Sequence, residues 1–118
     1  MLKTSWQYRE FTIRPWQPGD RAAAADIIRQ VLEEYGLPWE PDRADRDVIA
    51  VEEHYLQRGG EFWVVERQSQ DLDKTEIVGT GAYYPIPRHQ DKAVEIRKMY
   101  LLPAARGRGV GQYLLAQI

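Results

Sequence analysis

The sequence of 118 residues predicts a single α/β domain in which helices flank a mixed, mainly antiparallel sheet. Three observations support this fold class: short segments rich in β-branched and aromatic residues, longer segments with apolar residues at helical spacing, and the order of these segments. That order is a strand, two helices, three strands and a final helix. No repeat or linker divides residues 1–118, and 43% of them are apolar, which is ordinary for a domain with one core.

The first strand and the first helix are predicted over residues 8–16 and 21–35. Apolar and polar side chains alternate in the first segment, which is typical of a strand with one buried face. Pro18-Gly19-Asp20 ends the strand, and Asp20 is expected to be the N-cap of a helix that Gly36 closes as its C-cap. The apolar residues of that helix recur at three-and-four spacing and are assigned to the core: Ile27, Ile28, Val31, Leu32 and Tyr35.

The second helix is predicted from Asp45 to Arg58, after a connector at 36–41 that contains two prolines. Four acidic residues lie around Trp39 near the start of this region: Glu40, Asp42, Asp45 and Asp47. Such a surface would attract a cationic amine. Arg43 and Arg46 interrupt the acids, however, so a solvated face of mixed charge is favoured over such a surface.

The second half of the chain supplies the rest of the sheet. Residues 61–66 and 76–84 are expected to be neighbouring antiparallel strands, because both are β-rich and a polar connector separates them. A further strand is predicted over 93–101, and a helix from about Arg108 to the end of the chain. Apolar residues every four positions would bury that helix against the sheet: Val110, Leu114 and Ile118.

Composition excludes several classes of function. The formal net charge is −2 with both signs mixed along the chain, so nucleic acid is not an expected partner. The absence of cysteine rules out a disulfide framework, a thiolate zinc site and a cysteine nucleophile. His54 and His89 lack metal-ligand spacing, so no metal is expected. No apolar stretch approaches the ~20 residues of a membrane span, and we expect a cytoplasmic protein without membrane partners.

A glycine-rich turn at the start of the final helix is the most informative motif. Glycines at alternate positions allow backbone N–H groups to approach an anion closely, and the helix dipole favours negative charge there: Gly107, Gly109 and Gly111. Arg106 and Arg108 add charges that suit phosphate oxygens. A Walker loop would need Lys-Ser or Lys-Thr after its last glycine, and a dinucleotide fingerprint would need GxGxxG early in a βαβ unit. The remaining alternative is a tight turn whose arginines are merely solvated.

The segment from Glu95 to Leu115 resembles motif A of the GNAT superfamily of N-acetyltransferases. Arg106, Gly109 and Gly111 occupy the positions of the family pattern, and Pro103 precedes it at the family spacing. The resemblance implies the acyl-CoA N-acyltransferase fold and acetyl-CoA as cosubstrate. It further implies that backbone amides of the turn hold the CoA pyrophosphate and that the preceding strand contacts the pantetheine arm, through Met99, Tyr100, Leu101, Arg106, Gly107, Arg108, Gly109, Val110 and Gly111.

The implied reaction is the transfer of an acetyl group to a primary amine of a small molecule or a peptide. A free alkylamine has a pKa near ~10.4, so a carboxylate that removes a proton directly or through water is useful. Glu95 is the candidate base, and the alternative is that it pairs with Arg97 or Lys98 at the sheet surface. By the same resemblance, a backbone N–H near Met99 would stabilise the developing oxyanion. No catalytic tyrosine is assigned.

The resemblance covers roughly the first two-thirds of such a domain, so we expect a single GNAT domain that is incomplete at its C-terminus. The strand at 93–101 would then be an exposed edge, which makes a homo-oligomer possible. The alternative function is a noncatalytic acyl-CoA-binding or regulatory module. A protein-interaction scaffold, which would bind no CoA, is a third class.

Overall fold

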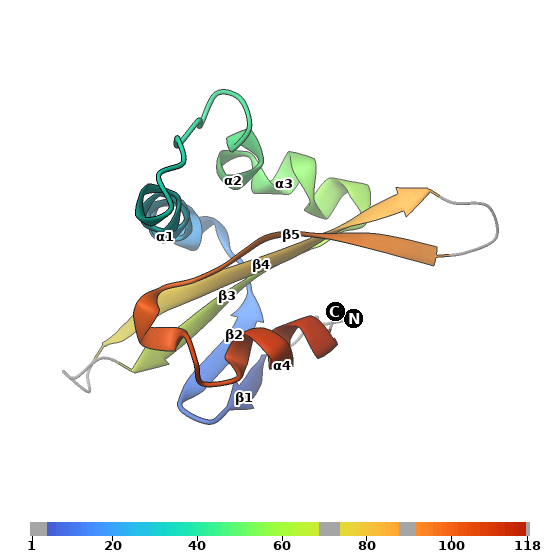
Figure 1. Ribbon diagram of the computed structural model, residues 1–118. Helices are drawn as coiled ribbons and strands as arrows, with labels where there is room; N and C mark the ends of the chain where they lie inside the picture. Colours follow the sequence, from blue (N-terminus) through green and yellow to red (C-terminus); the bar gives the residue numbers. More distant parts are fainter. Residues whose placement is uncertain (1–4, 69–73, 88–91, 118) are drawn as a thin grey trace.

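The computed structural model describes residues 5–68, 74–87 and 92–117. Its strands form one antiparallel sheet in the order β1-β2-β3-β4-β5 (Figure 1). The strands are β1 Trp6–Tyr8, β2 Phe11–Pro15, β3 Glu61–Gln68, β4 Thr75–Pro87 and β5 Lys92–Leu101. The helices are α1 Arg21–Glu34, α2 Arg46–Ile49, α3 Val51–His54 and α4 Val110–Gln117. The predicted α/β class with a mainly antiparallel sheet is confirmed.

Helices cover both faces of the sheet: α1, α2 and α3 lie on one face and α4 lies on the other (Figure 1). Strand β3 shows why two cores form. Phe62 and Val64 pack with the helices α1 to α3, whereas Trp63 and Val65 pack with α4. Since successive side chains of a strand point to opposite faces, a strand between two helical layers is apolar on both sides. None of the helices in the described ranges is long and apolar enough to cross a membrane.

Helix α1 confirms most of the first helical prediction. Gly36 has a φ of 71°, and the N–H of Leu37 donates to the carbonyl of Leu32 at 2.8 Å, which is the C-terminal closure expected of glycine. Tyr35 corrects the core assignment, because 66% of it is exposed while the four other predicted core residues are buried. The helix ends at Glu34, and Tyr35 therefore lies beyond the last buried turn.

Asp20 occupies the N-cap position of α1 as predicted, but its side chain does not cap the helix. Its backbone is helical, with φ −89° and ψ −8°, and its carboxylate makes no cap hydrogen bond. Instead Arg14 donates to both carboxylate oxygens at 2.8 Å, and the N–H of Gln17 donates at 2.7 Å. Burial alone would raise the pKa of Asp20, but these hydrogen bonds lower it below its ordinary value.

Two predicted elements are divided in the structure. Of the strand expected at 8–16, residues 11–15 form β2, while Tyr8 ends the preceding strand β1 because Arg9 adopts a φ of 55° and turns the chain. The single helix expected from Asp45 to Arg58 breaks at Ala50, whose φ and ψ are −102° and 56°. A guanidinium N–H of Arg21 on α1 donates to the carbonyl of Ile49, which would otherwise accept a bond within a continuous helix.

Helix α4 begins at Val110, two residues later than expected, because Gly109 has a φ of 81° that no helix accommodates. Val110 and Leu114 are buried as predicted. His89 and Ile118 lie outside the described residues.

Candidate active site

Strand β5 contains a bulge at Lys98 and Met99. In the pairing with β4, Tyr100 faces Thr80 and Arg97 faces Ala82, so two residues of β5 lie opposite one residue of β4. Lys98 has a φ of 51°, and its carbonyl accepts a hydrogen bond from the Thr80 hydroxyl at 2.7 Å. A bulge leaves its extra residue outside the ladder and re-aims the strand, as often happens beside active sites.

Two hollows meet at this bulge. The first, the α2 pocket, has a volume of about 420 Å³ and is lined by Arg43, Ala44, Arg46, Asp47, His54, Arg97, Lys98 and Tyr100. The second, the α4 groove, has a volume of about 500 Å³ and is lined by Val31, Tyr35, Met99, Tyr100, Leu101, Arg106, Gly111, Gln112 and Leu115. Lys98 borders the pocket, Met99 borders the groove, and Tyr100 borders both.

The α4 groove leads from the bulge to the glycine-rich turn. A Cβ at Gly111 would lie 3.3 Å from Cδ1 of Leu101, so this glycine allows α4 to approach β5 closely. Gly107 and Gly109 have φ values of 72° and 81°. The N–H of Tyr113 donates to the carbonyl of Gly109 at 3.0 Å, so the N–H groups of the preceding helical residues remain at the open helix start. This arrangement suits an anion.

The two arginines of the turn are engaged by carboxylates. Arg106 donates to both oxygens of Glu34, at 2.5 and 2.6 Å, and to the Leu101 carbonyl at 2.9 Å. Arg108 donates to Glu10 at 2.6 Å. The guanidinium groups are therefore ion-paired rather than directed at an anion. The backbone amides are the donors that this structure leaves open.

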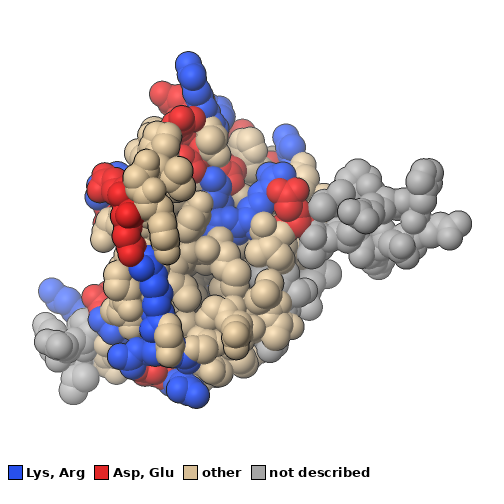
Figure 2. Space-filling view, in the orientation of Figure 1, with Lys and Arg blue, Asp and Glu red and all other residues tan. Residues whose placement is uncertain are grey.

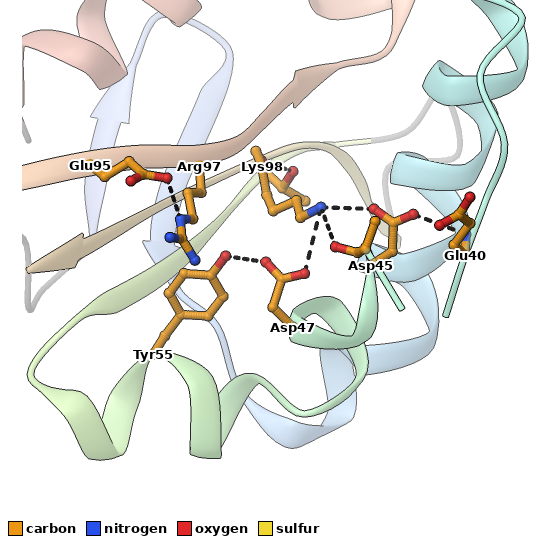
Figure 3. Close-up of polar contacts among 9 residues, drawn as sticks. Glu40, Asp45, Asp47, Tyr55, Glu95, Arg97 and Lys98 are labelled. Carbon is orange, nitrogen blue, oxygen red and sulfur yellow. Dashed lines mark hydrogen bonds and ion pairs between the residues drawn. The ribbon is translucent and has the colours of Figure 1, made fainter. Parts of the chain in front are cut away.

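A buried charge cluster holds the bulge from the other side (Figure 3). The Nζ atom of Lys98 lies 2.7 Å from Oδ1 of Asp45 and 3.5 Å from Oδ1 of Asp47, and the hydroxyl of Tyr55 donates to Asp47. Burial alone would lower the pKa of Lys98, but the two carboxylates raise it above its ordinary value. Lys98 therefore keeps its proton at neutral pH and is unsuited to act as a base.

These contacts give two of the acidic residues near Trp39 a role that neither sequence interpretation predicted. Asp45 and Asp47 are 4% and 8% exposed and face Lys98, so neither the cationic-substrate surface nor the solvated face describes them. Sequence reasoning missed this role because Asp45 and Lys98 lie 53 residues apart. It likewise did not single out Arg97 or His54 as lining residues of a pocket.

Glu95 lies on β5 at the edge of the cluster and is about half exposed. The Nε of Arg97 donates to its Oε1 atom at 2.6 Å, which is the pairing that the sequence offered as the alternative to catalysis. The Cζ atom of Arg97 also lies 4.7 Å from the centre of the Tyr84 ring. Within the described part of the chain, no donor contacts the second carboxylate oxygen of Glu95.

Solved structures share this fold. An acetyltransferase of the GNAT family from Staphylococcus aureus Mu50 superposes with a TM-score of 0.72 at 24% identity, over 92% of this chain and 62% of that one. A predicted acetyltransferase with acetyl-CoA from Clostridium acetobutylicum superposes with a TM-score of 0.67 at 17% identity, over 91% and 70% of the two chains.

The sequence comparisons identify the family. The model of the Acetyltransferase (GNAT) family matches residues 26–118, and this chain belongs to that family. It is 37% identical over 97 residues to the uncharacterized N-acetyltransferase YjgM of Escherichia coli strain K12. That match covers 80% of this chain and 54% of the relative, so the chain spans about half the length of the curated relative.

Proposed function

We propose that the chain forms the acetyl-CoA-binding part of an N-acetyltransferase that acetylates a primary amine of a small molecule or a peptide. The observation that carries the proposal is the meeting of the α4 groove and the α2 pocket at the bulge of β5. The groove is a site for the donor and the pocket is a site for the acceptor. The two reactants would then meet beside Met99.

The donor site uses backbone more than side chains. The amides of the glycine-rich turn would bind the CoA pyrophosphate, because they lie at the positive end of α4 and have no competing side chains at the glycines. The pantetheine arm would run along the main chain of Met99, Tyr100 and Leu101, which lines the mostly apolar groove. Arg106 and Arg108 would contribute through their backbone while their side chains stay with Glu34 and Glu10.

The bulge supplies the electrostatic part of the chemistry. Attack of the amine nitrogen on the thioester carbon places negative charge on the carbonyl oxygen before the C–S bond breaks and the thiolate departs. A backbone N–H near Met99, released from the ladder by the bulge, would donate to that oxygen. A donor fixed in this way needs no reorganisation during the reaction.

Glu95 would remove the amine proton through a water molecule. One of its oxygens is held by Arg97, which orients the carboxylate, and the other has room to accept a hydrogen bond. Lys98 is excluded from this role because Asp45 and Asp47 keep it protonated. Glu95 is therefore the base in this proposal, with Arg97 as its positioning residue.

A charge placed at the start of α4 tests the donor site. Gln112 lines the groove and is exposed at the third position of the helix, where an acidic residue stabilises the helix dipole. Gln112→Glu should therefore keep the fold while it weakens CoA binding by about tenfold or more, because it repels the pyrophosphate. Ala116→Glu adds the same charge at an exposed position near the other end of α4 and is the matched control.

Calorimetry with CoA measures the effect. Tight binding by the parent chain, lost in Gln112→Glu and retained in Ala116→Glu, supports the donor site. Equal affinity in all three proteins, or no binding by the parent chain, overturns it. Thiol release from acetyl-CoA with a panel of amines then separates an enzyme from a noncatalytic acyl-CoA-binding module, which would bind CoA without releasing thiol.

A further inference from the structure

The α2 pocket has more cationic than acidic side chains on its wall. We infer that the acceptor carries a negatively charged group, a carboxylate or a phosphate, and that the guanidinium groups of Arg43, Arg46 and Arg97 bind it. This inference rests on the proposed function and specifies the substrate class of the same site. It also differs from the interpretation, disfavoured by the sequence, in which acidic residues near Trp39 attract a cationic amine.

The two carboxylates of this region already share one partner, the Lys98 ammonium. Asp47 is the acidic residue in the described lining, and it pairs with Lys98 at 3.5 Å and accepts from the Tyr55 hydroxyl. Asp45 lies behind it, 2.7 Å from the same Lys98 ammonium, and also accepts from the N–H of Glu40 at 2.9 Å. Lys98 offsets one of these two negative charges, and both carboxylates are largely buried, so they offer few contacts to a substrate.

Arg43 and Arg46, by contrast, keep donors available. Both side chains are exposed, Arg43 just before α2 and Arg46 as the first residue of α2, and no carboxylate in the described ranges contacts either one. Arg97 binds Glu95 through Nε alone, and its remaining nitrogens point toward Tyr55 (Figure 3). Figure 2 shows Lys and Arg side chains between the helices α2 and α3 and strand β5, with Asp and Glu side chains beside them.

The chemistry of guanidinium groups indicates what they bind. A guanidinium presents paired N–H donors that match the two oxygens of a carboxylate or a phosphate. Arg97 is further fixed by its stacking on Tyr84, at 4.7 Å, so little conformational entropy is lost when it binds an anion. His54 lies in the same wall and offers an additional ring donor.

The arginine cluster lies next to the bulge, which favours a small acceptor. Arg97 and Lys98 precede Met99 on β5, and Tyr100 borders both the pocket and the groove. An acceptor whose anionic group contacts the arginines can therefore present an amine toward the bulge across a short spacer. Small amino acids and phosphorylated amines satisfy this description.

Three amines with the same two-carbon spacer distinguish the contribution of each anionic group from that of the amine itself. β-Alanine carries a carboxylate, phosphoethanolamine carries a phosphate, and ethanolamine carries neither. The 118-residue chain would be saturated with CoA and titrated with each amine by NMR, and thiol release would be measured in parallel with acetyl-CoA. We expect at least one anionic amine to bind about tenfold more tightly than ethanolamine, and the stronger of the two identifies the anion.

Variants assign the preference to the pocket. Arg43→Gln and Arg46→Gln should each reduce it, and the double variant should abolish it. Arg29→Gln removes the same charge from the exposed face of α1 and should leave it unchanged. Equal binding of the three amines, or a preference that survives the double variant, overturns the inference. CoA binding is measured separately, so its absence contradicts the proposed function, whereas CoA binding without anion preference contradicts this inference alone.

Discussion

The Nζ atom of Lys98 lies 2.7 Å from Oδ1 of Asp45, and this ion pair joins the bulge of β5 to the segment before α2. Lys98 has a φ of 51°, a conformation that costs a non-glycine residue about 1–3 kcal/mol. The side chain is 14% exposed and that of Asp45 is 5% exposed, so water screens the pair weakly. The ion pair therefore helps to offset the strain of the backbone that is proposed to bind the oxyanion.

Breaking this pair should destabilise the fold. Asp45→Asn keeps the shape of the side chain but leaves the Lys98 ammonium with Asp47 as its remaining carboxylate, and we expect a loss of about 3 kcal/mol in the free energy of unfolding. Lys98→Met should cost a comparable amount because it strands two carboxylates. In denaturant melts the double variant should lose clearly less than the sum of the single losses. Additive losses would show that the two side chains do not interact.

Gly109 provides a second test of backbone strain. It has a φ of 81°, and a Cβ at this position would lie 2.7 Å from the hydroxyl oxygen of Tyr8. The Tyr8 ring is held in place by stacking on Tyr113, with 4.4 Å between the ring centres. Gly109→Ala should therefore lower the free energy of unfolding by about 1–3 kcal/mol. Gly19→Ala is the control, because a Cβ at Gly19 meets nothing within 4 Å and the φ there is not positive. Equal melts for the two variants would contradict the described turn.

The ion pair between Arg21 and Glu52 predicts a specific loss of stability in acid. The two guanidinium N–H groups of Arg21 donate to Glu52 at 2.9 and 2.7 Å, and these hydrogen bonds lower the pKa of Glu52 to about 2. Because the folded pKa lies below the unfolded value of about 4.5, the stabilisation is present above that pH and is lost as the pH falls toward 2.

Thermal melts across that range measure the effect. At pH 6, Glu52→Gln should melt below the parent chain, and the difference should shrink as the pH falls from 4.5 to 2.5. Glu53→Gln, a change at the exposed neighbouring residue, should follow the parent chain throughout. A difference between Glu52→Gln and the parent that stays constant with pH would rule out the proposed linkage.

Local sequence signals predict much of the fold. The places where the structure differs from the prediction depend on contacts between residues distant in sequence. Helix α1 and its Gly36 closure follow from apolar spacing and glycine conformation, which are properties of neighbouring residues. The break at Ala50 depends on Arg21, 28 residues before the carbonyl of Ile49 that it binds. The turn at Arg9 contains no glycine, so the hairpin carried no turn signal in the sequence.

The candidate site likewise has features that local sequence predicts and features that depend on distant residues. The glycine-rich turn is visible in the sequence because its geometry requires glycines at fixed positions. The pairing of Arg106 with Glu34 joins residues that lie 72 positions apart, and no spacing rule predicts it. The bulge at Lys98 is equally impossible to predict from neighbouring residues, since its stabilising contacts come from Asp45 and Thr80.

The role proposed for Glu95 predicts a pH-dependent defect. Glu95→Gln should bind acetyl-CoA as the parent chain does but turn over about a hundredfold more slowly at neutral pH. The defect should shrink at high pH, where more amine is already deprotonated. Glu76→Gln is the control, because Glu76 makes a similar pair with Arg67 at 2.7 Å on neighbouring strands. A defect that does not change with pH would assign Glu95 a structural role.

Strand β5 is an edge strand, and this position predicts self-association. Within residues 5–68, 74–87 and 92–117, β5 pairs with β4 alone, so its other side presents backbone groups without strand partners. Such an edge is a template for pairing with another chain, and a second copy is the partner always present in a purified sample. We therefore expect light scattering to give a mass above that of one chain, rising with concentration.

Hydrogen exchange at two concentrations then locates the contact. Amides of β5 should exchange more slowly at the higher concentration, because pairing between copies buries them. Amides of β3, which lies between β2 and β4, should exchange equally slowly at both concentrations and serve as the internal control. A single-chain mass at every concentration, with β5 exchange unchanged, would show that this edge does not pair and that the sheet is stable with β5 at its border.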